Sequence, residues 1–234
     1  MNSTASAPAP WQSGIRGLRA NALPGLVLQA AALALVLGYY HAPAVHQALS
    51  DLARFRERQD IAFSAGCTAL TGGLVPFLYL HYGQRNASGR PRYGWGQGAA
   101  LIGFWAYRGL EVDYWYRFQA LMVGTGHDWR TIALKSFFDQ FLYSPLWAVP
   151  MTAAAYERID GEGLAADFRR GGWFRRRVLP LMISNIGVWL PAVAIIYALP
   201  TPLQLPLQNI VLCFYTLIVA HQTSPHANDP VRGG

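Results

Sequence analysis

Long stretches without a charged side chain constrain this sequence more than any other feature. No Asp, Glu, Lys or Arg occurs from Ala20 to Ser50, from Ile61 to Gln84, or from Val178 to Asn228. A helix needs about 20 mostly apolar residues to cross about 30 Å of hydrocarbon. Only 13% of the 234 residues are charged, about half the share found in ordinary soluble domains. The pattern therefore predicts an integral membrane protein.

The uncharged tracts, and two less apolar stretches between them, are each long enough to span a bilayer. The last tract exceeds one span, and the proline-rich residues 200–206 divide it, because proline cannot continue a helix. We expect an all-α, multi-pass transmembrane helix bundle of about six helices, with both termini on the same side. The expected spans are residues 22–44, 60–82, 98–123, 132–156, 178–199 and 205–221. They form a single transmembrane domain over residues 22–221, between a polar N-terminal tail (1–21) and a flexible C-terminal tail (222–234).

Two alternatives to this topology stay open. The first tract could be a cleavable signal peptide, although its apolar region is long for one. Four spans result if residues 98–123 and 132–156, which carry charges, form a peripheral hairpin. Basic residues outside the six spans favour both termini on the inner side, since 12 fall on that side and 4 on the other.

Packing between the helices is indicated by small residues in the second expected span. They recur every four positions in two rows: Ser64, Thr68 and Gly72, then Ala65, Ala69 and Gly73. Such rows let helix backbones approach closely in lipid. Prolines inside the expected spans predict kinks. These prolines are Pro76, Pro145, Pro150 and Pro191.

A basic surface loop is expected at residues 157–177. Arginines and aromatic residues alternate near its end, which is typical of a membrane surface, where rings lie among headgroups and guanidinium groups bind phosphates. The residues expected to contact lipid are Arg169, Arg170, Trp173, Arg175, Arg176 and Arg177. Nucleic acid is the alternative partner, but a basic flank mostly anchors the topology of a span. We expect the lipid bilayer, with anionic lipids at this loop, as partner and no nucleic acid. A homo-oligomer is left open.

Charged residues inside the third and fourth expected spans are the most informative candidates for a site. One charge at the centre of a span costs roughly 2.5–3.5 kcal/mol, so these charges require partners. The spacing predicts the pairs Arg108–Glu111, Asp113–Arg117 and Lys135–Asp139. The short linker 124–130 predicts an antiparallel hairpin with Arg117 and Asp139 at similar depth. The candidate network is Arg108, Glu111, Asp113, Arg117, Lys135, Asp139 and Gln140. It either lines a polar pathway or is a structural network that fixes helix register.

Three blocks of the same region resemble the peroxisomal-membrane-protein-22 / Mpv-seventeen family. Lys135 to Gln140, followed by Pro145, matches that family's pattern Lys-x-x-x-Asp-Gln-x-x-x-x-Pro. The other two blocks are similar to its Gly-Pro-x-x-His-x-Trp-Tyr segment and its Asn…Trp-Pro stretch. The residues that carry them are Gly109, Trp115, Tyr116, Asn185, Trp189 and Pro191. The resemblance implies a divergent member of a family of small multi-pass membrane proteins, with proposed roles as channels and no agreed enzymatic activity.

These observations lead to an expected function and one alternative. We expect a small non-selective or metabolite channel that uses the intramembrane charges of the third and fourth helices. The alternative is a non-transporting membrane organiser or scaffold in which those charges are structural. We expect no enzyme, cofactor or metal site, because the six histidines are scattered and none is spaced with Asp or Glu as metal ligands. Arginine far exceeds lysine, which favours a bacterial inner membrane; the mitochondrial inner and peroxisomal membranes are the alternatives.

Overall fold

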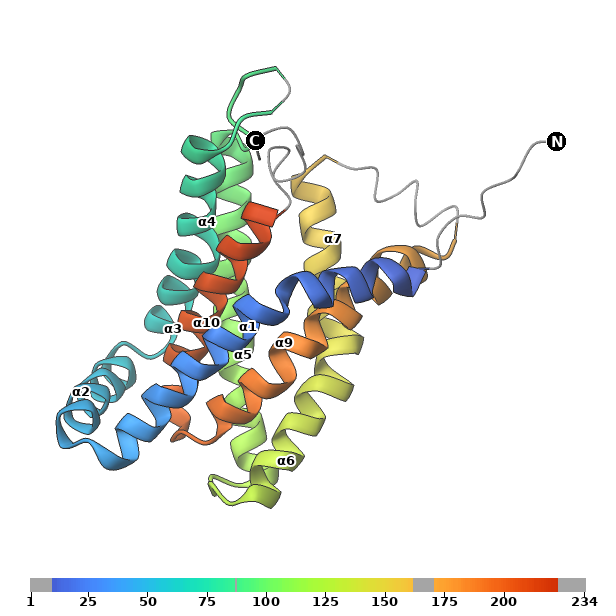
Figure 1. The fold of residues 1–234 in the computed structure, drawn as a ribbon. Helices are drawn as coiled ribbons and strands as arrows, with labels where there is room; N and C mark the ends of the chain where they lie inside the picture. The colour runs from blue at the N-terminus through green and yellow to red at the C-terminus, as the bar shows by residue number, and fades with distance from the viewer. Residues whose placement is uncertain (1–9, 87, 162–170, 223–234) are drawn as a thin grey trace, which may run out of the picture.

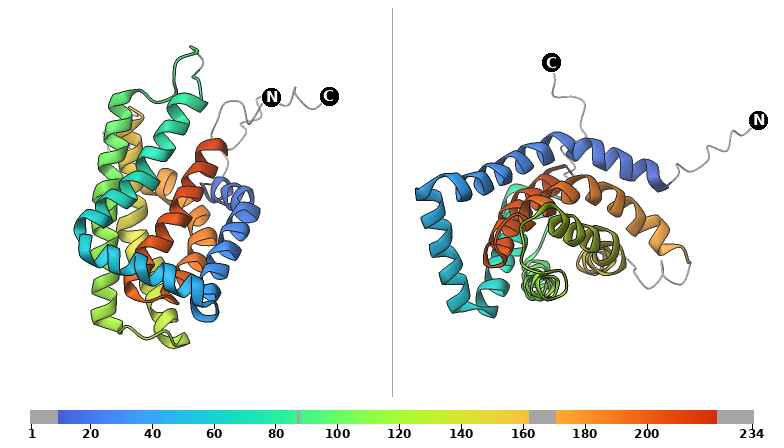
Figure 2. Two further views of the ribbon diagram at one scale, coloured as in Figure 1. Left: turned by 90° about the vertical axis from the view of Figure 1, so that its left-hand side faces the viewer. Right: turned by 90° about the horizontal axis from the view of Figure 1, so that it is seen from below.

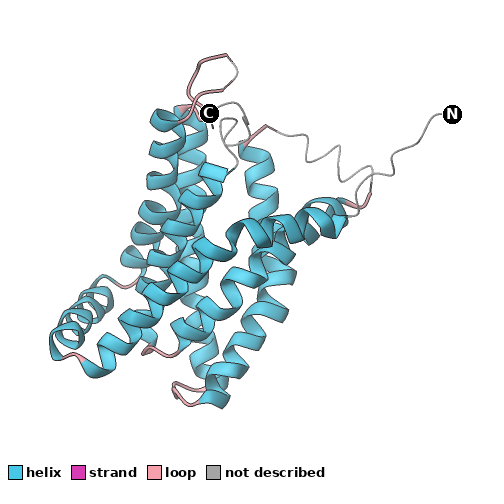
Figure 3. Ribbon diagram, viewed as in Figure 1, coloured by secondary structure: helices cyan, strands magenta, loops and turns pink. Residues whose placement is uncertain are grey.

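The computed structural model describes residues 10–86, 88–161 and 171–222, and in these ranges the chain is helical without a strand (Figure 3). The α-helices are α1 (Pro10–His41), α2 (Pro43–Gln59), α3 (Ile61–Thr68), α4 (Val75–Leu78), α5 (Trp95–Val123), α6 (Trp129–Phe137), α7 (Val149–Ile159), α9 (Leu179–Tyr197) and α10 (Thr201–Gln222). Wider, π-helical turns form η1 (Ala69–Leu74), η2 (Tyr79–Gly83), η3 (Phe138–Ala148) and η4 (Phe174–Val178). The all-α prediction is confirmed.

Three helical stretches within the described residues are long and apolar enough to cross a membrane: Gly14–His41, Ile61–Gly83 and Phe174–Tyr197. They coincide with the first, second and fifth expected spans, which supports a membrane location. The other three expected spans are helical as well. They correspond to α5, to the continuous α6–η3–α7 segment and to α10.

The helices form a bundle with α1 and α2 on its outside (Figure 1). Helix α5 and the α6–η3–α7 segment run side by side in opposite directions, as the short linker predicted. The loop 84–94 lies at one end of the bundle with the end of α7, and the α5–α6 turn lies at the other end. Seen from below, α1 and α2 make two sides of an L around the remaining helices (Figure 2).

The row of small residues in α3 and η1 packs directly on α5. Ser64 and Thr68 are fully buried there. A Cβ atom added to Gly109 would collide with the Ser64 carbonyl oxygen and would lie 2.7 Å from Thr68 Oγ1. On the same face, a Cβ on Gly72 would lie 2.6 Å from the Trp105 ring. The small residues therefore permit the close backbone approach that the sequence predicted.

Prolines disturb the helices through π-helical turns. Pro76, Pro150 and Pro180 each follow the last residue of η1, η3 or η4 by two positions. A proline has no N–H for the carbonyl four residues earlier and crowds it sterically. Each of those carbonyls falls inside the preceding π-helical segment, where the wider turn accommodates the missing bond. Pro145 lies within η3 itself, and Pro191 lies inside α9.

Several expected boundaries are wrong. Helix α1 begins at Pro10, within the range expected as a polar tail, and the unexpected helix α2 occupies residues 43–59. Helix α10 begins at Thr201 instead of residue 205, because Pro202 lies in its first turn, where proline is tolerated. The expected loop 157–177 is shortened by α7 and η4. Residues 162–170 and 223–234 of the expected loop and C-terminal tail lie outside the described residues.

Asp128 lies in the turn between α5 and α6, outside the expected spans, and directly precedes α6. Its carboxylate accepts hydrogen bonds from the backbone N–H groups of Arg130 and Thr131, which caps α6. The Thr131 hydroxyl, followed by the backbone bonds, lowers the pKa of Asp128. Its stabilising contribution is therefore complete above the pKa of the unfolded chain and is lost as the pH falls through the lowered pKa of the folded state.

The close packing of α5 predicts different effects for two of its glycines. Gly109→Ala should lower the free energy of unfolding by about 1–3 kcal/mol, because the added methyl group overlaps Ser64 and Thr68. Gly103→Ala is the matched control, since no heavy atom lies within 4 Å of its added Cβ. Thermal unfolding of the purified proteins in detergent measures both. Equal stability of the two variants would contradict the packing.

Candidate functional site

A cavity of about 380 Å³ lies inside the bundle, between α5, η3–α7, α9 and α10. At one end it is lined by Tyr93, just before α5, and by Asp160, just after α7. It extends along α5 past Arg108 to Tyr116 and includes Asp139 on η3. The cavity therefore leads from one end of the bundle to charged residues in its middle.

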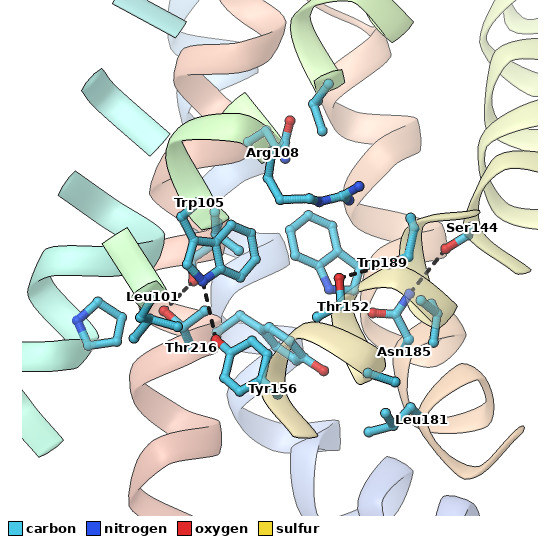
Figure 4. A pocket seen from close by; sticks show the side chains of 18 of the residues that line it. Leu101, Trp105, Arg108, Ser144, Thr152, Tyr156, Leu181, Asn185, Trp189 and Thr216 are labelled. Atoms are coloured by element: carbon cyan, nitrogen blue, oxygen red, sulfur yellow. Dashed lines mark hydrogen bonds between the residues drawn. The ribbon is translucent and has the colours of Figure 1, made fainter. Parts of the chain in front are cut away.

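Aromatic side chains form much of the cavity wall (Figure 4). Trp105, Tyr156 and Trp189 surround one space, and Arg108 lies at its end. Trp105 Nε1 donates a hydrogen bond to Tyr156 Oη (3.2 Å), and this bond connects α5 to α7. The Trp189 ring packs edge-on against Tyr215, with centroids 5.7 Å apart. These contacts hold the rings in fixed positions around the cavity.

The mouth of the cavity is closed in part by a bond between its two loops. Tyr93 Oη donates to Asp160 Oδ1 (2.5 Å), and the Tyr93 side chain is buried. Burial, and then the bond to the Asp160 carboxylate, raises the pKa of Tyr93 far above the usual value for tyrosine. Tyr93 therefore stays a neutral hydrogen-bond donor at physiological pH.

Arg108 forms its predicted ion pair with Glu111. Both groups also bond to Tyr143 on η3: Arg108 Nη1 donates to Tyr143 Oη (3.2 Å), and Tyr143 Oη donates to the Glu111 carboxylate. The pair is largely buried, with 8% and 13% of the two side chains exposed. The positive charge at the deep end of the cavity is thus matched by a carboxylate on the same helix.

Asp139 does not pair with Lys135, so this prediction was wrong. Its carboxylate accepts bonds from Tyr197 Oη (2.7 Å), Gln140 Nε2 (2.9 Å) and Trp115 Nε1 (3.3 Å). The expected pair assumed α-helical spacing, but the chain becomes π-helical at Phe138, so residues four apart across this junction no longer share a face. Lys135 is buried with its Nζ 5.7 Å from the Tyr197 ring centroid, and no ion pair within the described residues includes it.

Two buried tyrosines pack against each other at the deep end of the cavity. Tyr116 lines the deep end, and its ring packs edge-on against Tyr197, with centroids 5.5 Å apart. Gln119 braces this layer from α5. With its amide oriented to satisfy both ends, Nε2 donates to the Lys135 carbonyl oxygen (3.1 Å) and Oε1 lies 2.6 Å from Trp115 Nε1, whose single N–H is shared with Asp139.

A second ionic cluster lies on α5 outside the cavity lining, at about the same level of the helix as Tyr116. Arg117 pairs with Asp113 (2.8 Å), as predicted, and also with Asp60. Arg56 of α2 forms a further ion pair with Asp113, and both side chains are more than nine-tenths buried. Sequence reasoning counted Arg56 only among the basic residues outside the expected spans and did not predict its pair with Asp113. The amphipathic pattern of residues 43–59 was the signal that could have revealed α2.

The predicted network is therefore divided between three places. Arg108, Asp139 and Gln140 line the cavity, with Glu111 bonded to Arg108. Asp113 and Arg117 belong to the second ionic cluster. Lys135 does not line the cavity, and its ammonium group lies over the Tyr197 ring. Tyr197 was missed, because one sequence does not show which helix face meets Asp139.

The residues that carry the family resemblance occupy both wall and packing positions. Asn185 and Trp189 line the cavity with Tyr116, and Asn185 Nδ2 donates to Ser144 Oγ (3.4 Å). Trp115 stacks on Tyr143, with centroids 4.6 Å apart. Gly109 provides the close contact with α3, while Pro145 and Pro191 lie inside η3 and α9.

The basic segment departs from its expected lipid-facing arrangement. Trp173 is buried, and its Nε1 donates to Glu157 Oε2 (3.0 Å). Arg177 also pairs with Glu157, at 3.3 Å. Trp173 therefore anchors η4 to α7 and does not lie at the surface, whereas Arg175 and Arg176 are exposed. Arg169 and Arg170 lie outside the described residues.

The buried pair between α2 and α5 predicts an effect on stability. Arg56→Met should lower the free energy of unfolding by about 3 kcal/mol, because it leaves Asp113 buried with only Arg117 as partner. Adding Asp113→Leu should recover part of that loss. Arg54→Met is the control: Arg54 pairs with Asp51 on the same helix, but more than half of each side chain is exposed, so it should cost under about 1 kcal/mol. Denaturant unfolding in mixed micelles measures the stability of these variants. Equal losses of stability in the Arg56 and Arg54 variants would contradict a buried ion pair between Arg56 and Asp113.

Comparisons with protein-family models, with curated proteins and with solved structures give no match. The resemblance to the peroxisomal-membrane-protein-22 / Mpv-seventeen family thus stays a prediction. In the part of the chain that the structure describes, no group of three or more His, Cys, Asp or Glu side chains could hold a metal ion.

Proposed function

We propose that this protein is a small non-selective or metabolite channel with six membrane spans, and that the cavity is its vestibule. The observation that carries the proposal is the course of the cavity, from the bundle end at Tyr93 and Asp160 to the charges at Arg108 and Asp139. Ionisable groups inside a membrane protein are costly, and they typically line a watery cavity or a solute pathway.

The six-span topology is supported by the lengths and arrangement of the helices. Helix α5 has 29 residues, which at about 1.5 Å per residue exceeds the thickness of the hydrocarbon core. Helix α10 has 22 residues, enough for one span. The excess of basic residues on the side of both termini supports an inner location for the cavity mouth, in a bacterial inner membrane.

The tyrosine layer serves as the gate in this proposal. Tyr116 and Tyr197 are both almost fully buried, and their rings pack together where Tyr116 lines the end of the vestibule. Conduction requires the two rings to separate. Lys135 and Asp139, which both contact Tyr197, would then border the open path.

A non-transporting membrane organiser is the second candidate. It is favoured by the ion pairs of the second cluster, which join α2, α5 and the start of α3 without lining the cavity. In this role the charges would fix helix register, and the exposed Arg175 and Arg176 would bind anionic lipids.

The channel proposal predicts a conductance that depends on the tyrosine layer and its neighbours. Protein reconstituted in planar bilayers should conduct small ions, and Tyr197→Ala should raise the conductance or the open probability several-fold. Lys135→Gln should shift the reversal potential in a salt gradient toward cation selectivity, and Asp139→Asn should shift it toward anion selectivity, because each removes one charge from the path.

Arg54→Gln is the control, because Arg54 is exposed on α2 and distant in sequence from the cavity residues. It should leave conductance and selectivity unchanged. Absence of conductance in every variant would reject the channel and leave the organiser. A conductance insensitive to Lys135 and Asp139 would reject the path past Tyr197.

A further inference from the structure

The cavity has the size and the walls of a small-molecule binding site. Its volume of about 380 Å³ falls at the lower end of the range for ligand pockets. The Trp105, Tyr156 and Trp189 rings surround its space, as Figure 4 shows. Aromatic walls of this kind suit a flat, apolar body of one or two rings, which can stack on them or meet them edge-on.

Unpaired polar atoms in the cavity wall indicate what else the ligand carries. Gln140 Oε1 and Gln208 Oε1 have no hydrogen-bond partner among the described residues, although only 5% and 8% of these residues are exposed. Arg108 Nε is unpaired as well, at 7% exposure. A buried polar atom without a partner is unfavourable. The two oxygens require hydrogen-bond donors, and the nitrogen requires an acceptor.

The charges around the cavity argue against a charged ligand. Arg108 is already paired with Glu111, so it offers no free positive charge to an anion. The Asp139 carboxylate is only 7% exposed and already accepts bonds from three donors of the protein, so a cation would have to displace one of them. At the mouth, Arg92 and Asp160 add one charge of each sign. An ion would lose its hydration here without gaining a free counter-charge.

We infer that this cavity binds a small, uncharged aromatic molecule whose polar end both donates and accepts hydrogen bonds. Its ring lies among Trp105, Tyr156 and Trp189, and its polar end lies beside Gln140, Gln208 and Arg108, whose unpaired atoms are covered in this structure. One part of the inference rests on the proposed function: in a channel, this molecule is the solute that enters the vestibule. The binding itself does not require conduction.

The test uses three fluorinated probes with the same ring and different tails. The 5-fluoro derivatives of tryptophol, tryptamine and indole-3-acetate carry a hydroxyl, an ammonium and a carboxylate group. Binding to the full chain in nanodiscs is followed by ¹⁹F NMR of the probe, with empty nanodiscs subtracted to remove partition into lipid. The hydroxyl probe should bind saturably and at least tenfold more tightly than either charged probe.

Variants of two glutamines on α10 locate the binding. Gln208→Leu should weaken binding of the hydroxyl probe about tenfold, because it removes the hydrogen-bond acceptor that the ligand satisfies. Gln204→Leu is the control: Gln204 is also buried and its Oε1 is also unpaired, but it does not line the cavity, and its Nε2 donates to the Leu199 carbonyl oxygen. Trp189→Leu should weaken binding of the same probe, because it removes one aromatic ring from the cavity wall. It serves as a second variant if Gln208→Leu fails to fold.

Absence of saturable binding to the unaltered protein would overturn the inference. So would tighter binding of a charged probe, or equal effects of Gln204→Leu and Gln208→Leu. The two proposals fail separately: saturable binding of the hydroxyl probe without conductance rejects only the channel, and conductance without binding of that probe rejects only this ligand class.

Discussion

The cost of burying charge in a membrane protein is the constraint on which the rest of this structure depends. Each charge at bilayer depth requires a partner or water. The chain meets this requirement with two separate arrangements: Arg108 with Glu111 at the cavity, and Asp113 with Arg56 and Arg117 outside it. Both arrangements use α5, so this helix carries charges on opposite faces and lies between other helices on both.

Irregular helix geometry places the remaining charges. The π-helical segment η3 turns Asp139 away from Lys135 and toward Tyr197 and Trp115. A regular α-helix would have paired Lys135 with Asp139 and left Tyr197 without its carboxylate partner. The prolines near η3 thus influence chemistry as well as shape, since they favour the wide turns that set which side chains face the cavity.

Hydropathy and length predicted the helical class and its principal elements, because those features follow from local composition. Local spacing also predicted the pairs Arg108–Glu111 and Asp113–Arg117, which lie within one α-helix. Pairs that depend on tertiary packing or on π-helical register were missed: Arg56 with Asp113, and Asp139 with Tyr197. The cavity was missed as a shape because its wall combines residues of several helices. Six of its lining residues were nevertheless named from the sequence: Arg108, Asp139 and Gln140 in the charge network, and Tyr116, Asn185 and Trp189 through the family resemblance.

The central claim, that the cavity opens toward one membrane face and is closed at the tyrosine layer, is tested most directly by cysteine labelling. Thr152 lines the cavity, and Cys67 and Cys213 do not. In a Cys67→Ser, Cys213→Ser background, Thr152→Cys should react with a membrane-impermeant thiol reagent added on the side of the loop 84–94. It should not react with the same reagent added on the opposite side. Labelling from the opposite side, or from neither, would contradict the account.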